Sequence, residues 1–206
     1  MIVLFLLLLV IAGAVFWWRG RQRIEQQHGA SQPASAERSV FNLEIGDIVQ
    51  NDLRDWIVET IYQYNQDGFK WIEYLLRDGD DVVWLSVVED DWLELSWMTP
   101  VPSEDVAVSM PLRDSILFDG VSYQRVDRGL ARFRTIGRSR NQDGFCQFHD
   151  YKGPDQRCLS VEIYGTEFDQ GDLELCVGER IQAQELSLLP GDGRSVYGSS
   201  TRVESQ

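Results

Sequence analysis

The sequence predicts a mainly β protein, a duplicated β-meander that follows a single N-terminal transmembrane helix. Three observations predict it: an uncharged apolar run opens the chain, β-branched and aromatic residues alternate through its middle, and short blocks recur there in the same order. The 206 residues, 43% hydrophobic and 25% charged, fit a globular chain of one domain or of two small halves packed together.

The apolar run predicts a membrane anchor. Residues 2–18 carry no charged side chain, and a helix of that length covers roughly 26 Å, near the lower limit for crossing a bilayer. Arg19, Arg21 and Arg23 follow the run. A cleaved signal peptide, the alternative, has its basic residues before the apolar run, so the order here favours a retained anchor over residues 1–19.

The arginines also set the expected location of the chain. Positive charges that follow a span resist translocation, so the sequence predicts a single-pass protein of the bacterial plasma membrane with its N-terminus outside and its C-terminal domain cytoplasmic. Membrane lipid is then the partner of the helix. Residues 20–42 form a flexible tether, and residues 190–206, rich in Gly and Ser, form a disordered tail. A net charge of −14 argues against a nucleic-acid partner.

Residues 43–189 predict β-strands joined by short turns. The run from Trp56 to Tyr64 is rich in β-branched and aromatic residues, and a second run extends from Phe69 to Arg77. Because alternate residues share a face of a strand, each run predicts one set of side chains on one face. The first set is Trp56, Val58, Thr60, Tyr62 and Tyr64, and the second is Phe69, Trp71, Glu73 and Leu75.

The link between these two runs predicts a tight hairpin. The segment Asn65-Gln66-Asp67-Gly68 has Asn first, Asp third and Gly last, which suits a type I turn closed by a glycine in the left-handed conformation. We therefore expect a positive φ at Gly68.

Sequence blocks from the first half of the domain recur in the second half. The recurring pairs are Asn65–Phe69 with Asn141–Phe145, Leu85–Val87 with Leu159–Val161, and Leu93–Leu95 with Leu173–Leu175. The order is kept while the loop lengths change. The chain therefore predicts two meanders, 43–99 and 115–189, that form two SH3-like or small-barrel halves sharing a core, since each half alone has few strands to cover its apolar face.

Motifs in the first half resemble a known family. The segments Gly46-Asp47-Ile48-Val49, Trp71-Ile72-Glu73 and Trp84-Leu85-Ser86-Val87, with Glu89 close behind, are similar to the bacterial domain of unknown function 4178 family, and the likeness covers about residues 43–189. Members of that family often carry an N-terminal membrane helix. The resemblance implies no activity, and gene neighbourhoods of some members point to membrane-associated partners.

The sulfur and imidazole groups do not predict a metal or catalytic site. Cys146 and His149 lie three positions apart, so in a strand they point to opposite faces, which fits zinc poorly. Buried thiols are the favoured interpretation of Cys146, Cys158 and Cys176. His149 as a base for Cys146 or Ser160 lacks a glycine elbow or an oxyanion motif. We assign no catalytic residue, metal ligand or cofactor.

Glu73 is an unusual residue, because it shares a face with apolar neighbours. If it points inward it needs a partner, and the sequence offers Arg77, Arg125 or Arg132. The acidic clusters around residues 78–81 and 89–94 are predicted to be solvated turns.

Three classes of function remain open. Tryptophans are concentrated in the first half, so the predicted binding surface comprises Trp71, Glu73, Trp84 and Glu89. The leading hypothesis is a protein-interaction or scaffolding module with an unknown protein partner. The alternatives are a small-ligand-binding domain with an aromatic-lined cleft and an enzyme of unrecognised type. A pocket with convergent polar groups favours the ligand, a flat apolar patch favours the protein partner, and strongly shifted titratable groups favour the enzyme.

Overall fold

The computed structural model describes residues 37–102, 110–139, 141, 143–165 and 172–195. The chain divides into the units Met1–Glu37 and Arg38–Gln206, and the fold described here is that of the second. Its elements are β1 (Ile48–Asn51), β2 (Arg54–Gln66), β3 (Phe69–Asp78), β4 (Asp81–Glu89), β5 (Leu93–Pro100), β6 (Ser115–Phe118), β7 (Val121–Gly137), β8 (Gly144–Lys152), β9 (Arg157–Tyr164), β10 (Asp172–Ile181), the 3-10 turn η2 (Ala183–Glu185) and β11 (Ser187–Leu189).

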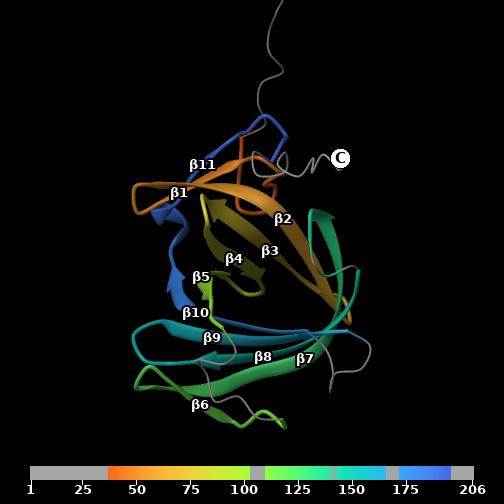
Figure 1. Cartoon of the computed structure of the whole chain (residues 1–206), viewed down its shortest axis with the longest axis vertical. Helices are drawn as coiled ribbons and strands as arrows, with labels where there is room; N and C mark the ends of the chain where they lie inside the picture. The colour runs from red at the N-terminus through yellow and green to blue at the C-terminus, as the bar shows by residue number, and fades with distance from the viewer. Residues whose placement is uncertain (1–36, 103–109, 140, 142, 166–171, 196–206) are drawn as a thin grey trace, which may run out of the picture. The chain divides into compact units, whose positions relative to one another are not determined.

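The strands form one antiparallel sheet that closes on itself. The order of neighbours is β11-β1-β2-β3-β4-β5-β10-β9-β8-β7-β6, and an additional pairing of β2 with β7 completes a ring of eight strands. The chain therefore folds as a closed eight-stranded barrel, in which β1 and β11 extend the sheet beyond β2 and β6 extends it beyond β7 (Figure 1).

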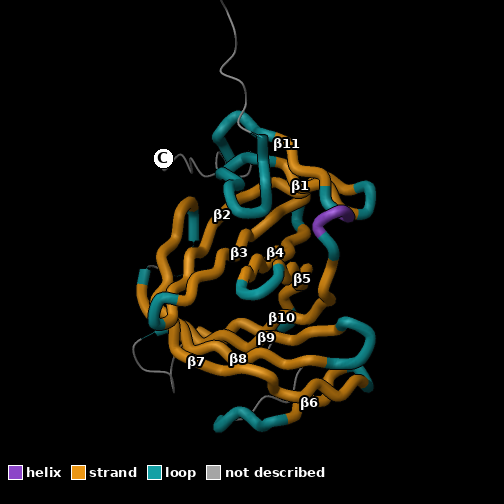
Figure 2. Tube along the Cα trace, turned by 180° about the vertical axis from the view of Figure 1, so that it is seen from behind, coloured by secondary structure: helices purple, strands orange, loops and turns teal. Residues whose placement is uncertain are grey.

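The two halves of the chain contribute equally to this ring. β2–β5 and β7–β10 are each a four-stranded meander, and their outer strands pair with each other, β2 with β7 and β5 with β10. The prediction of two SH3-like or small-barrel halves sharing a core is therefore wrong, since both halves build a single barrel. The physical reason is that an open meander has two unpaired edges, and pairing the edges of both meanders satisfies all four. Figure 2 shows the strands curving around one interior.

Side chains alternate between the barrel interior and two cores on its outer surface. In β4, Val83, Leu85 and Val87 belong to the outer core over β2–β5, which also receives residues from β1 and from the chain near η2. A second outer core covers β8–β10 with residues from β6 and β7. The aromatic part of the interior comprises Tyr62, Tyr64, Trp71, Trp84, Phe133, Phe148 and Tyr164. Because both faces of the sheet are covered, β4 is apolar at each position from Val82 to Val88 except Ser86.

The predicted face of the first strand is wrong, and a β-bulge is the reason. Trp56 and Val58 pack in the outer core, whereas Tyr62 and Tyr64 point into the barrel. The register of β2 against β3 shifts between Val58 and Thr60. An extra residue at a bulge reverses the alternation beyond it. The second predicted face is confirmed: Phe69, Trp71 and Glu73 line the interior cavity, and Leu75 packs against the aromatic interior.

The hairpin turn between β2 and β3 is confirmed in place but not in type. Gly68 has a φ of 104°, as expected, but Asp67 also has a positive φ of 52°. With Gln66 paired to Phe69, this is a two-residue type I′ turn, whose twist matches that of the flanking strands. The recurring block at Asn141 lies instead in the longer connection from β7 to β8.

We correct the prediction of a transmembrane helix. Within the described residues, no helix has the length and the apolar character needed to cross a bilayer, and the helical structure found there is the short η2. The segment 1–19 itself lies outside the described residues. The structure therefore does not support the predicted single-pass membrane protein or membrane lipid as the partner of an N-terminal helix. It also does not support the predicted location, a plasma membrane with the C-terminal domain in the cytoplasm. We withdraw these predictions.

Candidate functional site

The barrel encloses a cavity of about 340 Å³. Residues of β3, β4, β5, β8, β9 and β10 build most of its wall, with Gln66 of β2 and Asp127 of β7 at its border, and Trp71, Trp84 and Phe148 supply aromatic surface. Trp92, in the turn between β4 and β5, is 66% exposed at the cavity. Ligand sites in proteins occupy about 300–1,000 Å³, so this cavity suits a small organic molecule.

The described lining residues carry far more negative than positive charge. Two are basic, Lys152 and Arg180. Eight are acidic: Glu73, Asp90, Asp91, Glu94, Asp127, Asp150, Glu162 and Glu174. Arg180 is already engaged, because its Nη2 lies 2.6 Å from Oε2 of Glu94. The wall therefore has a large excess of carboxylates over cations.

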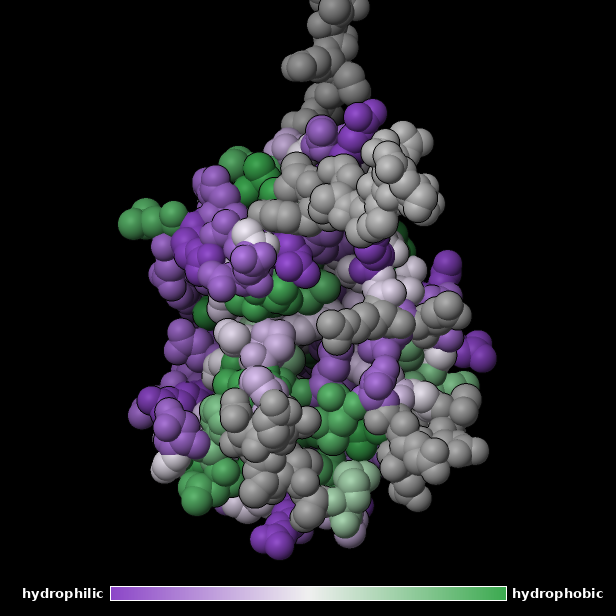
Figure 3. Space-filling model, viewed as in Figure 1, coloured by the Kyte–Doolittle hydropathy of each residue, from purple (hydrophilic) through white to green (hydrophobic). Residues whose placement is uncertain are grey.

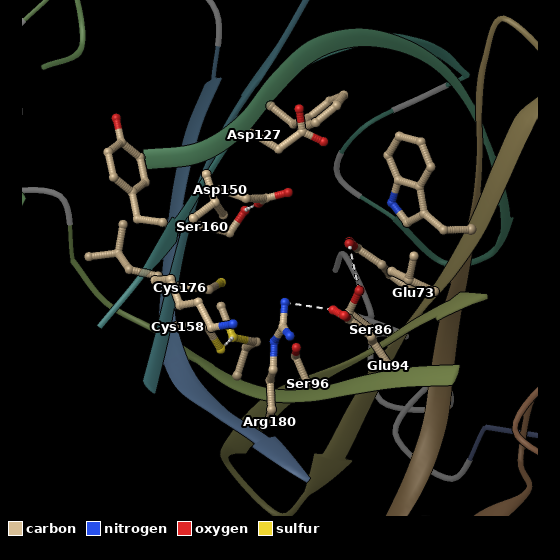
Figure 4. Close-up of a pocket in the computed structure, with 18 of the residues that line it drawn as sticks. Glu73, Ser86, Glu94, Ser96, Asp127, Asp150, Cys158, Ser160, Cys176 and Arg180 are labelled. Atoms are coloured by element: carbon tan, nitrogen blue, oxygen red, sulfur yellow. Dashed lines mark hydrogen bonds and ion pairs between the residues drawn. The ribbon is translucent and has the colours of Figure 1, made fainter. Parts of the chain in front are cut away.

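Two of these carboxylates have matching serine partners. Glu73 on β3 lies opposite Ser86 on β4, and the Ser86 hydroxyl donates to Oε1 of Glu73 at 3.3 Å. Asp150 on β8 lies opposite Ser160 on β9, and the Ser160 hydroxyl donates to Oδ1 of Asp150 at 2.8 Å. Figure 4 shows the two pairs on separate walls of the cavity. No lysine or arginine forms an ion pair with Glu73 or Asp150 among the described residues.

Glu162 belongs to a buried hydrogen-bond network with two tyrosines. The Tyr64 hydroxyl lies 3.3 Å from Oε2 of Glu162, and the same carboxylate oxygen accepts from the Tyr164 hydroxyl. The two phenol oxygens lie 2.8 Å apart. Tyr64 also interacts with Glu73, so a single tyrosine connects the carboxylates of β3 and β9. Glu162 therefore has uncharged phenol hydroxyls as its hydrogen-bond donors.

Burial makes these carboxyl groups weaker acids than in water. It raises the pKa of Glu73 to about 7, with a further contribution from the negative charge of Asp150. It raises the pKa of Asp150 to about 6, while Ser160 and Arg180 act in the opposite direction. Burial and the neighbouring Glu73 also raise the pKa of Glu162 well above its usual value. The cavity can therefore hold or release protons near neutral pH.

The sulfur atoms line the same interior but do not form a metal site. Cys158 and Cys176 contact the cavity, Cys146 is fully buried in the aromatic interior, and all three are free thiols. Burial raises the pKa of Cys158 to about 11, so its thiol is protonated at neutral pH. His149 points to the other side of β8, next to Val161. Among the described residues, no three His, Cys, Asp or Glu side chains are placed to hold a metal ion.

The structure brings together three of the four predicted binding residues. Trp71, Glu73 and Trp84 lie on the cavity wall, and each tryptophan is less than a tenth exposed. Glu89 lies at the exposed end of β4 and does not line the cavity. The hydrogen-bond donor that the structure shows for Glu73 is Ser86, in place of the predicted arginine.

Sequence reasoning missed the carboxylates of the second half. The recurring Leu-Ser-Val block places Ser86 and Ser160 on the cavity wall, and the recurring Leu-Glu-Leu block places Glu94 and Glu174 there. The repeats therefore contained the signal, because their central residues share one face of the sheet. Asp150, Glu162 and Arg180 lie outside these matched blocks or at positions where the halves differ.

Comparison with known proteins identifies the family. A model of the family described as "Domain of unknown function (DUF4178)" matches residues 44–183. The chain is 31% identical over 152 residues to uncharacterized protein Rv2597 of Mycobacterium tuberculosis (strain H37Rv) and to uncharacterized protein Mb2628 of Mycobacterium bovis, covering 70% of each chain in both cases. No solved structure matches. The predicted resemblance is confirmed, and the chain belongs to the DUF4178 family.

Proposed function

We propose that this domain binds a small organic ligand inside its barrel. The observation that carries the proposal is the cavity of about 340 Å³, whose wall combines aromatic surface with enclosed polar groups. Binding sites for small molecules are typically concave and apolar, with a few polar groups that fix the orientation of the ligand. Trp71 and Trp84 supply the apolar surface, and the pairs Glu73–Ser86 and Asp150–Ser160 supply the polar groups.

The positions of the tryptophans favour a ligand over a protein partner. Trp71 and Trp84 face the cavity, so they are not available to anchor a protein on the outer surface. The exposed large apolar side chains include three on β7, Val126, Leu130 and Ile136, and the others are spread over other strands and turns. On the face shown in Figure 3, hydrophilic side chains interrupt the hydrophobic ones. The protein-interaction hypothesis therefore has less support than the ligand hypothesis.

Each part of the wall has a distinct task in this proposal. The rings of Trp71, Trp84 and Phe148 pack against the apolar part of the ligand and exclude water from it. The carboxylates accept hydrogen bonds from its polar part. Trp92 is held by a 2.8 Å hydrogen bond from its Nε1 to Oε1 of Glu94. It is more exposed than the other aromatic residues that line the cavity, and it is placed to cover a bound molecule.

A cavity-filling variant tests the proposal. Ser86→Phe places a ring in the cavity, and Ser122→Phe places the same ring at an exposed position of β7. The full-length chain and both variants are screened by thermal unfolding against small metabolites grouped as cationic, neutral and anionic. We expect at least one group to raise the Tm of the wild type and of Ser122→Phe, but not of Ser86→Phe. Equal stabilisation of all three proteins would place binding outside the barrel and contradict the proposal.

The folded state of Ser86→Phe is verified by its circular dichroism spectrum. If that variant does not fold, Ser96→Phe fills the cavity from β5 instead. No change in Tm with any group, in a wild type that folds normally, would also contradict the proposal.

A further inference from the structure

The ligand class follows from the charge of the cavity. Resting on the proposed function, we infer that the cavity binds an organic cation carrying two protonated amino groups. The partly buried lining residues leave a negative excess, because one is basic, Arg180, and five are acidic: Glu73, Glu94, Asp150, Glu162 and Glu174. Enclosed charges of one sign are unfavourable unless a partner compensates them. A cationic ligand supplies that compensation, and an anionic one would add to the repulsion.

The cavity's guanidinium does not neutralise this excess. Arg180 lies 2.6 Å from Glu94, so one pair of charges cancels locally. Glu73, Asp150 and Glu162 accept hydrogen bonds from hydroxyl groups, which carry no charge. Oδ2 of Asp150 has no hydrogen-bond partner among the described residues, and the Asp150 side chain points into the cavity (Figure 4). It is free to accept from a ligand ammonium.

The number of amino groups follows from the placement of the carboxylates. Glu73 and Asp150 come from β3 and β8, each with its own serine partner on the next strand. Figure 4 shows them on opposite sides of the cavity rather than converging on one point. A single ammonium group or a metal ion contacts one such position, whereas a molecule with an amino group at each end contacts both. The aromatic rings of Trp71 and Trp84 suit the chain between them and stabilise a cation by cation–π attraction.

The experiment compares probes that differ in charge but not in size. Binding to the full-length chain is measured by titration calorimetry at low salt and about pH 8, above the raised pKa values of Glu73 and Asp150, so that both carboxyl groups are ionised. The probes are 1,4-diaminobutane, butylamine, 1-butanol and butyrate, with linear diamines of three to six carbons to find the best length. We expect the diamine to bind at least tenfold more tightly than butylamine, and both more tightly than 1-butanol and butyrate.

Variants locate the binding. Glu73→Gln and Asp150→Asn are each expected to weaken the diamine at least tenfold, because each removes the charge of one pair while keeping its shape. Glu89→Gln, the matched control, removes a carboxylate of the same half outside the cavity and leaves the affinity unchanged. Circular dichroism verifies that all three fold. If Glu73→Gln does not fold, Asp150→Asn alone decides the test.

The outcomes separate this inference from the proposed function. If butyrate or 1-butanol binds as tightly as the diamine, and Ser86→Phe abolishes this binding, the cavity binds ligands but the inference of a cationic ligand is wrong. Equal affinity for butylamine and the diamine overturns the two-amine inference. An equal heat signal from calcium or magnesium ions, lost in the same variants, would assign the carboxylates to an inorganic cation. If the probes bind the wild type and Ser86→Phe equally, both the inference and the proposed function fail.

Discussion

Ser86 and Ser160 occupy matching positions in the barrel, and each donates a hydrogen bond to the carboxylate directly across the strand pair. The oxygen-to-oxygen distances are 3.3 Å from Ser86 to Glu73 and 2.8 Å from Ser160 to Asp150. Both serines are central residues of the recurring Leu-Ser-Val block. The repeat in the sequence is therefore a repeat of polar cavity groups as well as of strands.

The raised pKa values predict that stability falls as the pH rises. Burial raises the pKa of Glu73 from 4.5 to about 7 and that of Asp150 from 3.8 to about 6. At a pH between the usual pKa of a group and its raised pKa, the folded state binds more protons than the unfolded state. The stabilising contribution of each group is therefore fully present below its usual pKa and is lost as the pH rises through its raised pKa. Urea unfolding of the ligand-free protein at about pH 5 and about pH 8 measures the effect.

A double variant isolates these two groups. Glu73→Gln with Asp150→Asn removes both titrations, so we expect a smaller difference in the free energy of unfolding between the two pH values than in the wild type. Some dependence remains, because Glu162 still titrates inside the barrel. An unchanged difference would contradict the assignment of raised pKa values to Glu73 and Asp150.

A side chain at Gly68 is expected to strain the backbone of the turn without clashing with a neighbouring residue. Its φ is 104°, and a Cβ built there meets no heavy atom within 4 Å. Gly68→Val is expected to lower the free energy of unfolding by about 1–2 kcal/mol, because a β-branched residue resists a positive φ. Gly68→Asn should cost less, since Asn tolerates that conformation better. Denaturant unfolding compares them, and equal losses would show that the positive φ is not the cause.

Gly178 is expected to be indispensable at the junction of the two meanders. It lies on β10 opposite Met98 of β5, and a Cβ there would lie 1.9 Å from the carbonyl oxygen of Trp97. Gly178→Ala must push these strands apart and is expected to lower the free energy of unfolding by about 1–3 kcal/mol. Gly120→Ala is the control for backbone strain alone, because Gly120 has a φ of 74° but a Cβ there meets no heavy atom within 4 Å. Gly178→Ala should therefore be the less stable of the two. If the two variants are equally stable in denaturant, the close approach of β5 and β10 is wrong.

The reaction rates of the thiols on the cavity wall are expected to depend on the negative charge of the cavity. Burial raises the pKa of Cys158 to about 11 and also raises that of Cys176, so both should react slowly at neutral pH. A positively charged methanethiosulfonate reagent should modify them faster than a negatively charged one of similar size, because the carboxylate wall attracts cations. Peptide mass spectrometry follows the modification, and urea should remove the difference. Faster reaction with the anionic reagent would contradict a negative cavity.

The sequence by itself determined the local features of this protein. Alternation placed Trp71 and Glu73 on one face because the period of a strand is two residues, whatever the strand pairs with. The Asp-Gly dipeptide predicted a positive φ at Gly68, since glycine adopts that conformation without the steric cost of a Cβ. The repeats located strands of matching role, and the motifs around Trp71 and Trp84 identified the family.

Tertiary structure decided how these elements close and what the site contains. The pairing of β2 with β7 joins residues far apart in the sequence, such as Thr60 and Gly137, and hydrogen bonds between strand edges depend on no local pattern. The bulge after Val58 reversed a face that alternation had assigned differently. Glu73, Asp150 and Glu162 line one cavity only because the barrel closes around them. Their raised pKa values follow from that burial, which is a property of the assembled barrel and not of any one strand.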